Sequence, residues 1–199
     1  MAGLMKRLGL IVLVFSLGSI AATTGNSRPS TPPDEPKQGF RAEIIGQLGF
    51  VEKRIEDLAG AMPAEKYSWR PGDGVRSVGE VYMHIVGANY LFMSFLGVKP
   101  PMKMDPGMEK SVTDKAEIAA KFKPSFEHFR KSVLELSDKD LDKSTTMFGR
   151  TTTYRNVLVT AIAHMHEHLG QSIAYARMNG VVPPWTAAEQ AEAAKKDAK

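Results

Sequence analysis

Four segments of this chain repeat apolar residues with the period of an α-helix, and this pattern constrains the fold most strongly. They span residues 40–62, 77–97, 113–136 and 154–178. Ser77 and Glu80 form a capping-box pattern at the start of the second segment, and Asn179-Gly180 is a good stop for the fourth. Amphipathic helices bury their apolar stripes only against one another. We therefore predict an all-α fold, a four-helix bundle over residues 39–184.

Pro124 lies inside the third helical segment and predicts a kink or a division of that helix. The segments between the helices carry weaker signals. Residues 145–153 resemble a short hairpin or extended loop around Gly149. The methionine-rich loop 99–112 offers either flexible packing or the rim of a pocket, and Trp69 offers either aromatic packing or a binding-site wall. Residues 185–199 form a polar tail, expected as a frayed helix or as disorder.

The amino terminus predicts export. Residues 1–22 have the three parts of a secretory signal peptide: Lys6 and Arg7, an apolar run, and small residues. The run is shorter than the roughly 20 residues that a membrane span needs. A periplasmic or secreted protein is expected, without stable membrane association after cleavage and membrane-tethered if the signal stays in place. Residues 23–38 are proline-rich and predict an extended linker.

Charge and cysteine content exclude several classes of function. The formal net charge is +4, and removal of Lys6 and Arg7 with the signal peptide lowers it to +2. So small an excess does not indicate a nucleic-acid-binding protein. The chain has no cysteine, which rules out disulfides, thiolate metal ligands and a cysteine nucleophile.

Three of the five histidines stand in one run, His164, His166 and His168. At about 100° per residue, His164 and His168 share one helix face, whereas His166 points nearly the opposite way. Because the helix fixes the separation of the two imidazoles, such a pair can hold one metal ion. Gln171 lies close to the pair and could fix an imidazole tautomer or hold a bound water.

A third ligand must come from another segment, and His84 is the candidate. It lies in the apolar stripe of the second segment, where a lone histidine is more often a hydrogen-bonded core residue. Bundle cores, however, hold metal sites built from facing helices. Three imidazoles suit zinc or nickel, and also iron or copper, rather than calcium or magnesium. A buried polar cluster without metal is the alternative. His128 lies off the stripe of its segment and is predicted to be a solvated surface residue.

Several motifs occur together in one order along the chain. They are Glu52-Lys53-Arg54-Ile55 to Met62-Pro63, Tyr67-Ser68-Trp69-Arg70-Pro71, Val75-Arg76-Ser77-Val78-Gly79-Glu80 with His84, and His164-x-x-x-His168-x-Gly170-Gln171. Over residues 40–184 the chain resembles the DinB/YfiT-like family of four-helix-bundle metalloproteins. The resemblance implies His84, His164 and His168 as metal ligands. Leu169 departs from it, because many members carry arginine or histidine there. Export argues against the cytoplasmic thiols that some relatives use.

The sequence leaves two functions close together. One is an exported metal-dependent hydrolase or transferase acting on a small molecule, because three protein ligands leave an open coordination position. The other is a non-catalytic metal-binding module, structural or sensory. A third, an inverted zinc-protease motif in His164-x-x-Glu167-His168, is a weak match, because a helical bundle offers no edge strand to hold a peptide. A homodimer through the methionine-rich loop is a further expectation.

Overall fold

The structure, a computed structural model, describes residues 35–103, 105 and 107–198. Within these ranges the chain is mainly helical, as predicted. The helices are α1 (Phe40–Ala61), α2 (Val78–Ser94), α3 (Met108–Ser111), α4 (Lys115–Glu135), α5 (Tyr154–Met178) and α6 (Pro184–Asp197). The strands are β1 (Ser144–Met147) and β2 (Arg150–Thr153), and short 3-10 turns span Ala64–Lys66 and Asp138–Asp142. The predicted signal peptide, the predicted linker before Glu35, and Met104 lie outside the described residues.

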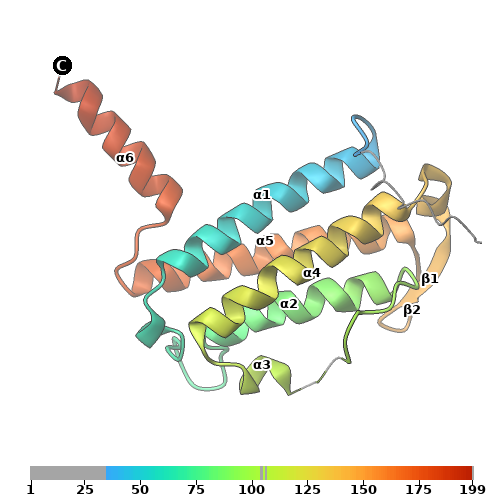
Figure 1. Ribbon diagram of the computed structural model, residues 1–199, viewed down its shortest axis with the longest axis horizontal. Coiled ribbons are helices and arrows are strands. Elements are labelled where there is room, and N and C mark those ends of the chain that lie inside the picture. Colours follow the sequence, from blue (N-terminus) through green and yellow to red (C-terminus); the bar gives the residue numbers. More distant parts are fainter. Residues whose placement is uncertain (1–34, 104, 106, 199) are drawn as a thin grey trace, which may run out of the picture. The chain divides into compact units, whose positions relative to one another are not determined.

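Four long helices, α1, α2, α4 and α5, lie side by side (Figure 1). Helix α1 packs against α4 and α5, and α2 packs against the same two helices. Their apolar stripes meet in one core that contains fully buried side chains such as Leu48, Phe126 and Leu158. Burial of apolar surface is the main force that holds helices of this kind together. Helix α2 therefore lies directly against α5, and this contact brings the predicted site residues together.

Side-chain caps set the starts of three of the four long helices, α2, α4 and α5. Ser77 Oγ accepts a hydrogen bond from the backbone N–H of Glu80, and the Glu80 carboxylate accepts one from the backbone N–H of Ser77. Asp114 caps α4 and Thr153 caps α5 in the same way, through the N–H groups three residues later. Each cap satisfies a backbone donor that the helix leaves free. The cap at Ser77 also fixes the phase in which α2 presents His84.

The structure answers several questions that the sequence left open. Helix α4 runs without a break through Pro124, so that residue does not divide it. Strands β1 and β2 form the predicted hairpin, with Met147 opposite Arg150. Trp69 is partly buried against the core and packs edge-to-face on Tyr175, with ring centroids 5.4 Å apart, as the packing alternative predicts.

The expected polar tail is helical as far as Asp197, because α6 covers it up to that residue. It begins at Pro184, and its first turn contacts α1, because the guanidinium of Arg54 lies 4.6 Å from the ring centroid of Trp185. The same guanidinium lies 4.4 Å from the ring centroid of Phe50 on its own helix. The cation–π contacts of this guanidinium with both rings therefore tie the start of α6 to α1. None of the helices in the described ranges has the length and apolar character that a membrane crossing requires.

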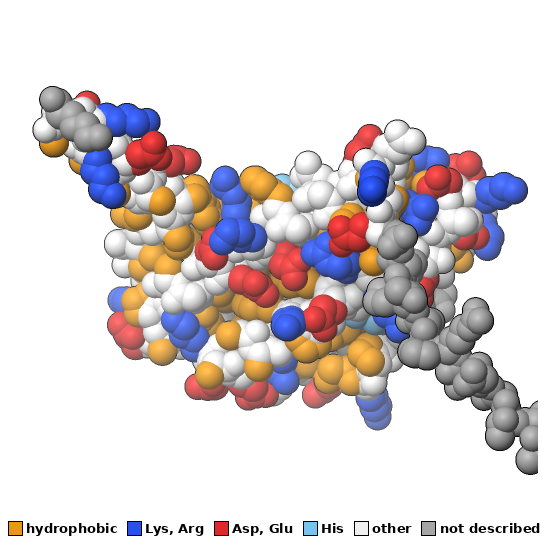
Figure 2. Space-filling model, turned by 45° about the horizontal axis from the view of Figure 1, so that its top comes forward, with side chains coloured by type: hydrophobic (Ala, Val, Ile, Leu, Met, Phe, Trp, Pro, Cys, Tyr) orange, Lys and Arg blue, Asp and Glu red, His pale blue; other side chains and the backbone are white. Residues whose placement is uncertain are grey.

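Charged side chains of both signs intermingle on the face shown in Figure 2. Several pair within a helix, such as Lys53 with Asp57, and others pair between helices, such as Arg130 with Glu52. Exposed pairs of this kind contribute little to stability individually. These surface pairs do not indicate a functional site, and the candidate site is formed by polar groups between α2 and α5.

Candidate metal centre

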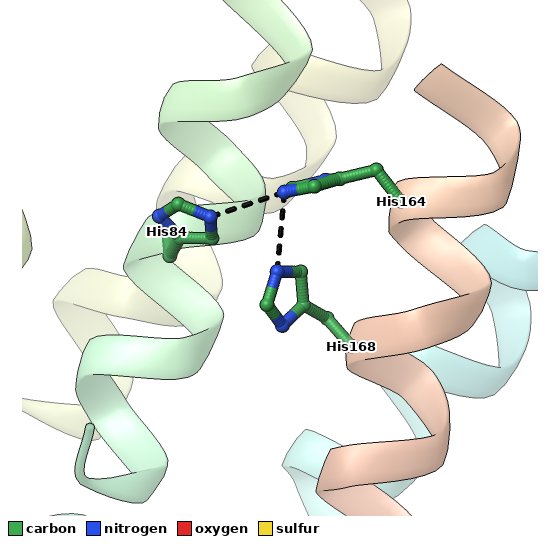
Figure 3. A group of neighbouring side chains, drawn as sticks. All are labelled: His84, His164 and His168. Carbon is green, nitrogen blue, oxygen red and sulfur yellow. Dashed lines mark hydrogen bonds between the residues drawn. The ribbon is translucent and has the colours of Figure 1, made fainter. Parts of the chain in front are cut away.

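Two helices bring three imidazoles together. His84 lies on α2, and His164 and His168 lie one turn apart on α5 (Figure 3). The Nε2 atom of His164 lies 3.1 Å from the Nε2 atom of His84 and 3.1 Å from that of His168. Each ring offers one nitrogen to a common point, and these nitrogens all lie within 4.8 Å of one another. The three residues that the sequence selected therefore form one cluster that could hold a metal ion.

Hydrogen bonds on the outer side of the cluster fix two of the three tautomers. His84 Nδ1 lies 2.9 Å from Glu109 Oε2, and His168 Nδ1 lies 2.8 Å from Gln171 Oε1. Carboxylate and amide oxygens only accept hydrogen bonds, so both Nδ1 atoms carry the proton. In a neutral imidazole the lone pair is then on Nε2. His84 and His168 both direct a lone pair at the centre of the cluster.

Gln171 is itself held in one orientation. Its Nε2 donates to the hydroxyl of Tyr175 over 2.9 Å, and that hydroxyl donates to the backbone carbonyl of Arg76 over 3.2 Å. This chain of donors leaves the amide oxygen to face His168. The predicted role of Gln171 in fixing a tautomer thus has a physical basis, although Tyr175 was not recognised as part of it.

His164 stands between the other two rings. Burial first, and then the neighbouring His168 and His84, lower the pKa of His164 to about 4, so the ring is neutral at pH 7. Its Nδ1 is buried and has no hydrogen-bond partner among the described residues. If His164 Nε2 carries the proton, it satisfies only one of the two lone pairs facing it. A cation at the centre would satisfy both, and three neutral imidazoles are a donor set that zinc and similar transition metals accept.

Comparison with known proteins places the chain in a family. The family model described as DinB superfamily matches residues 47–172, which is more than half of the chain. This chain belongs to the DinB superfamily. The uncharacterized protein YjoA of Bacillus subtilis (strain 168) is 27% identical to it over 142 residues, which make up 69% of this chain and 90% of YjoA.

Solved structures of other proteins share the fold. A DinB-like protein of Bacillus cereus superposes with a TM-score of 0.64 at 24% identity, covering 71% of this chain and 93% of that one. The structure of YjoA gives a TM-score of 0.56 at 24% identity, covering 70% and 93%. A conserved protein of Enterococcus faecalis gives 0.56 at 16% identity, covering 68% and 94%. At these identities the likeness concerns the fold alone.

In this DinB-superfamily chain, Glu109 is a site residue that the sequence analysis missed. Its carboxylate accepts hydrogen bonds from Arg76 Nε over 2.6 Å and from His84 Nδ1. Partial burial acts to raise the pKa of Glu109, but the bonds from Arg76 and His84 outweigh it and leave the pKa below its usual value. Glu109 is therefore anionic at pH 7. A carboxylate behind a ligand histidine orients the ring and increases its basicity.

A cavity of about 750 Å³ lies beside the cluster. Its lining residues are Met83, His84, Gly87, Ala88, Tyr90, Leu91, Phe92, Ser94, Asp105, Met108, Glu109, Phe148, Thr160, Ala163, His164 and Glu167. Met108 thus contributes to the rim of a pocket, one of the two alternatives for the methionine-rich loop. The cavity gives a small molecule access to two of the three imidazoles.

The two remaining histidines lie outside the cluster. His166 contacts α1, with its Nε2 3.3 Å from Gln47 Oε1 and its ring stacked on Phe50. The prediction for His128 was wrong. It is half-buried between α4 and α2, its ring lies 5.1 Å from that of Tyr90, and its Nε2 is buried without a hydrogen-bond partner among the described residues. The apolar stripe of α4 is wide enough to take in this position.

Proposed function

We propose that this chain is an exported metalloprotein, built as a four-helix bundle, in which His84, His164 and His168 hold one divalent transition-metal ion. Zinc or nickel fits the three imidazoles best, and iron also fits. We further propose that it is a metal-dependent hydrolase or transferase acting on a small molecule in the adjoining cavity. The convergence of three Nε2 atoms, two of them with fixed lone pairs, carries the proposal.

The surrounding residues support chemistry at such a centre. A bound divalent ion with an open position would polarise a substrate oxygen or activate water. Glu109 and Gln171 hold protons on the outer nitrogens of His84 and His168, so that their inner nitrogens remain free to bind. The cavity would hold a substrate on the side of His84 and His164.

Metal analysis tests the first part. The protein is purified without an affinity tag, stripped with a chelator, and titrated with zinc and with nickel in a calorimeter. We expect one equivalent to bind and His84→Ala to lose that binding. Less than one equivalent with every metal, or unchanged binding in His84→Ala, would overturn the site. Hydrolysis or transfer is then tested on ester, amide and thiol-transfer substrates, with the stripped protein as control.

A second function has its own support, because the ion would join α2 to α5. A structural or sensory module would gain stability from this link without turning over a substrate. It is favoured if chelation lowers the melting temperature while all three substrate classes stay unreacted. The cavity beside the histidines favours the enzyme, since a purely structural ion needs no such space.

Export is tested separately. The full chain is expressed in a bacterium, and the mass of the protein in the periplasm or medium is measured. Cleavage after the small residues near Ala21 is expected to give a mature chain that begins close to residue 22. A full-length mass in the membrane fraction would indicate a tether, and a full-length mass in the cytosol would overturn export.

A further inference from the structure

Aromatic and acidic side chains line the cavity beside the histidine cluster. Its aromatic residues are Tyr90, Phe92 and Phe148, and its charged residues are Asp105, Glu109 and Glu167. Among the described residues, the lining contains no lysine or arginine. Aromatic faces and carboxylates both attract cations, and a cation between them is favoured further when apolar walls exclude water.

Basic residues near the cluster lie on the other side of Glu109. Arg70, Arg76 and Lys110 line a separate, more polar recess, and Glu109 lines both spaces. Because Glu109 is already bonded to Arg76 and His84, its charge is largely satisfied. Glu167 takes part in none of the ion pairs among the described residues. Asp105 also takes part in none of them, but its Oδ1 accepts a hydrogen bond from the backbone N–H of Gly107 over 2.8 Å. Glu167 is therefore the carboxylate of the cavity best able to meet a charge on a ligand.

We propose that this cavity selects small organic cations, apolar molecules that carry an amine or quaternary ammonium group, and discriminates against carboxylates. Glu167 supplies the charge, and the aromatic residues supply the apolar walls. The inference rests on the proposed function, in that it takes the cavity as the substrate side of the metal site. It also gives a role to the glutamate of the His164-x-x-Glu167-His168 motif, which the metal cluster does not use.

The conformation of Phe148 supports a binding role for the aromatic wall. It occupies the first position of the two-residue turn between β1 and β2, with φ 50°, and is followed by Gly149 with φ 77°. Asparagine is preferred at such a position, and a bulky residue with positive φ is strained. Phe148 is 65% exposed, yet its ring packs edge-to-face on Phe92 and Phe95 at the cavity. A strained, exposed aromatic residue of this kind is typical of a functional position.

Three probes with one hexyl chain test the proposal: hexyltrimethylammonium, hexanol and hexanoate. Quaternary ammonium has no lone pair and cannot ligate a metal, so its binding reports on the cavity alone. Dissociation constants are measured by NMR titration on both stripped and zinc-loaded protein. In the stripped protein we expect hexyltrimethylammonium to bind most tightly and hexanoate most weakly. Hexanoate binding to stripped protein as tightly as the ammonium probe would overturn the proposal.

Two substitutions distinguish the contribution of the Glu167 charge to binding from that of the aromatic walls of the cavity. Glu167→Gln should weaken the ammonium probe by roughly 2- to 5-fold, the size of a partly exposed ion pair, and leave hexanol unchanged. Glu127→Gln removes an exposed carboxylate from α4 and is the matched control. Phe148→Asn introduces a residue that the turn prefers, so the hairpin should be retained, and it should weaken binding of the ammonium probe and of hexanol together. An unchanged ammonium affinity in Glu167→Gln would overturn the assignment of that residue.

The outcomes also distinguish this inference from the proposed function. Glu167→Gln and Phe148→Asn should still bind one equivalent of zinc, because neither residue belongs to the histidine cluster. If zinc fails to bind but the stripped protein keeps the ranking of the probes, the metal site is wrong and the cation cavity stands. If zinc binds but the probes do not follow the expected ranking, the metal site stands and the proposal of a cation-selective cavity is wrong.

Discussion

The histidine cluster and His128 both lie between helices, and they differ in what the ring nitrogens contact. Between α2 and α5, the outer nitrogens of His84 and His168 are held by oxygen acceptors, and the inner nitrogens converge. Between α2 and α4, the ring of His128 packs against the ring of Tyr90. Its Nε2 is buried and has no hydrogen-bond partner among the described residues. Burial alone therefore does not make a histidine a candidate ligand. A histidine becomes a candidate ligand when a hydrogen bond fixes its ring and its lone pair points at those of other histidines.

The largest expected effect is the loss of metal binding when a ring of the cluster is removed. His168→Ala takes away one of three ligands and should weaken zinc binding at least about 100-fold, since each ligand bond carries several kcal/mol of the binding free energy. His166→Ala, two residues away on the same helix, should bind zinc as the wild type does. Calorimetric titration of both variants checks the contrast. Equal loss in both would mean that helix disruption, rather than ligation, explains the effect.

The next effect is on stability. A ligand that binds only the folded state adds about 2.7 kcal/mol to the free energy of unfolding when its free concentration is 100 times its dissociation constant. We expect zinc to raise the melting temperature of the wild type, and a chelator to lower it again. His84→Ala should show no such response. A zinc-dependent shift that persists in His84→Ala would place the ion elsewhere.

Glu109→Gln should have a smaller effect on metal binding. The amide oxygen can still accept the proton of His84 Nδ1, but the negative charge that increases the basicity of the ring is lost. Loss of such a partner weakens metal binding by roughly 10-fold or more. Glu65→Gln changes an exposed carboxylate that belongs neither to the cluster nor to the lining of the cavity, and is the control. Identical zinc affinities in wild type and Glu109→Gln would show that Glu109 does not support the ligand.

The helical positions of the site could be predicted from sequence because helical geometry is regular. Seven residues from the cap at Ser77 to His84, and four from His164 to His168, fix where the rings lie on their faces. Glu109 could not be found in this way. It lies on the four-residue α3, which follows an irregular connection whose path no periodicity describes. Its approach to His84 is a tertiary contact that only the folded chain reveals.

The error at His128 has a different cause. A single apolar stripe gives the centre of a buried face but not its width, and Tyr90 from α2 covers a position at its margin. The hairpin shows the same limit at a smaller scale. Gly149 indicated the turn, but no sequence rule places a phenylalanine beside it with positive φ. Both residues lie where a neighbouring element, rather than local preference, decides the conformation.

The smallest expected effect concerns stability and pH at His128. His128→Phe removes a buried, unpaired nitrogen and should raise the free energy of unfolding by about 1 kcal/mol at pH 8. Burial lowers the pKa of His128 below its ordinary value of 6.5. At pH 8 the ring is neutral in both the folded and the unfolded state. As the pH falls below 6.5, the unfolded chain takes up the proton first, so the folded state loses stability.

His128→Phe should remove this loss, so its advantage over the wild type should widen between pH 8 and pH 5. Urea denaturation in the presence of a chelator measures the difference without a contribution from bound metal. All other residues are the same in the two proteins, so their contributions cancel in the comparison. An advantage that stays constant or narrows on acidification would show that His128 is solvated, and the two histidine environments would then differ less than their geometry indicates.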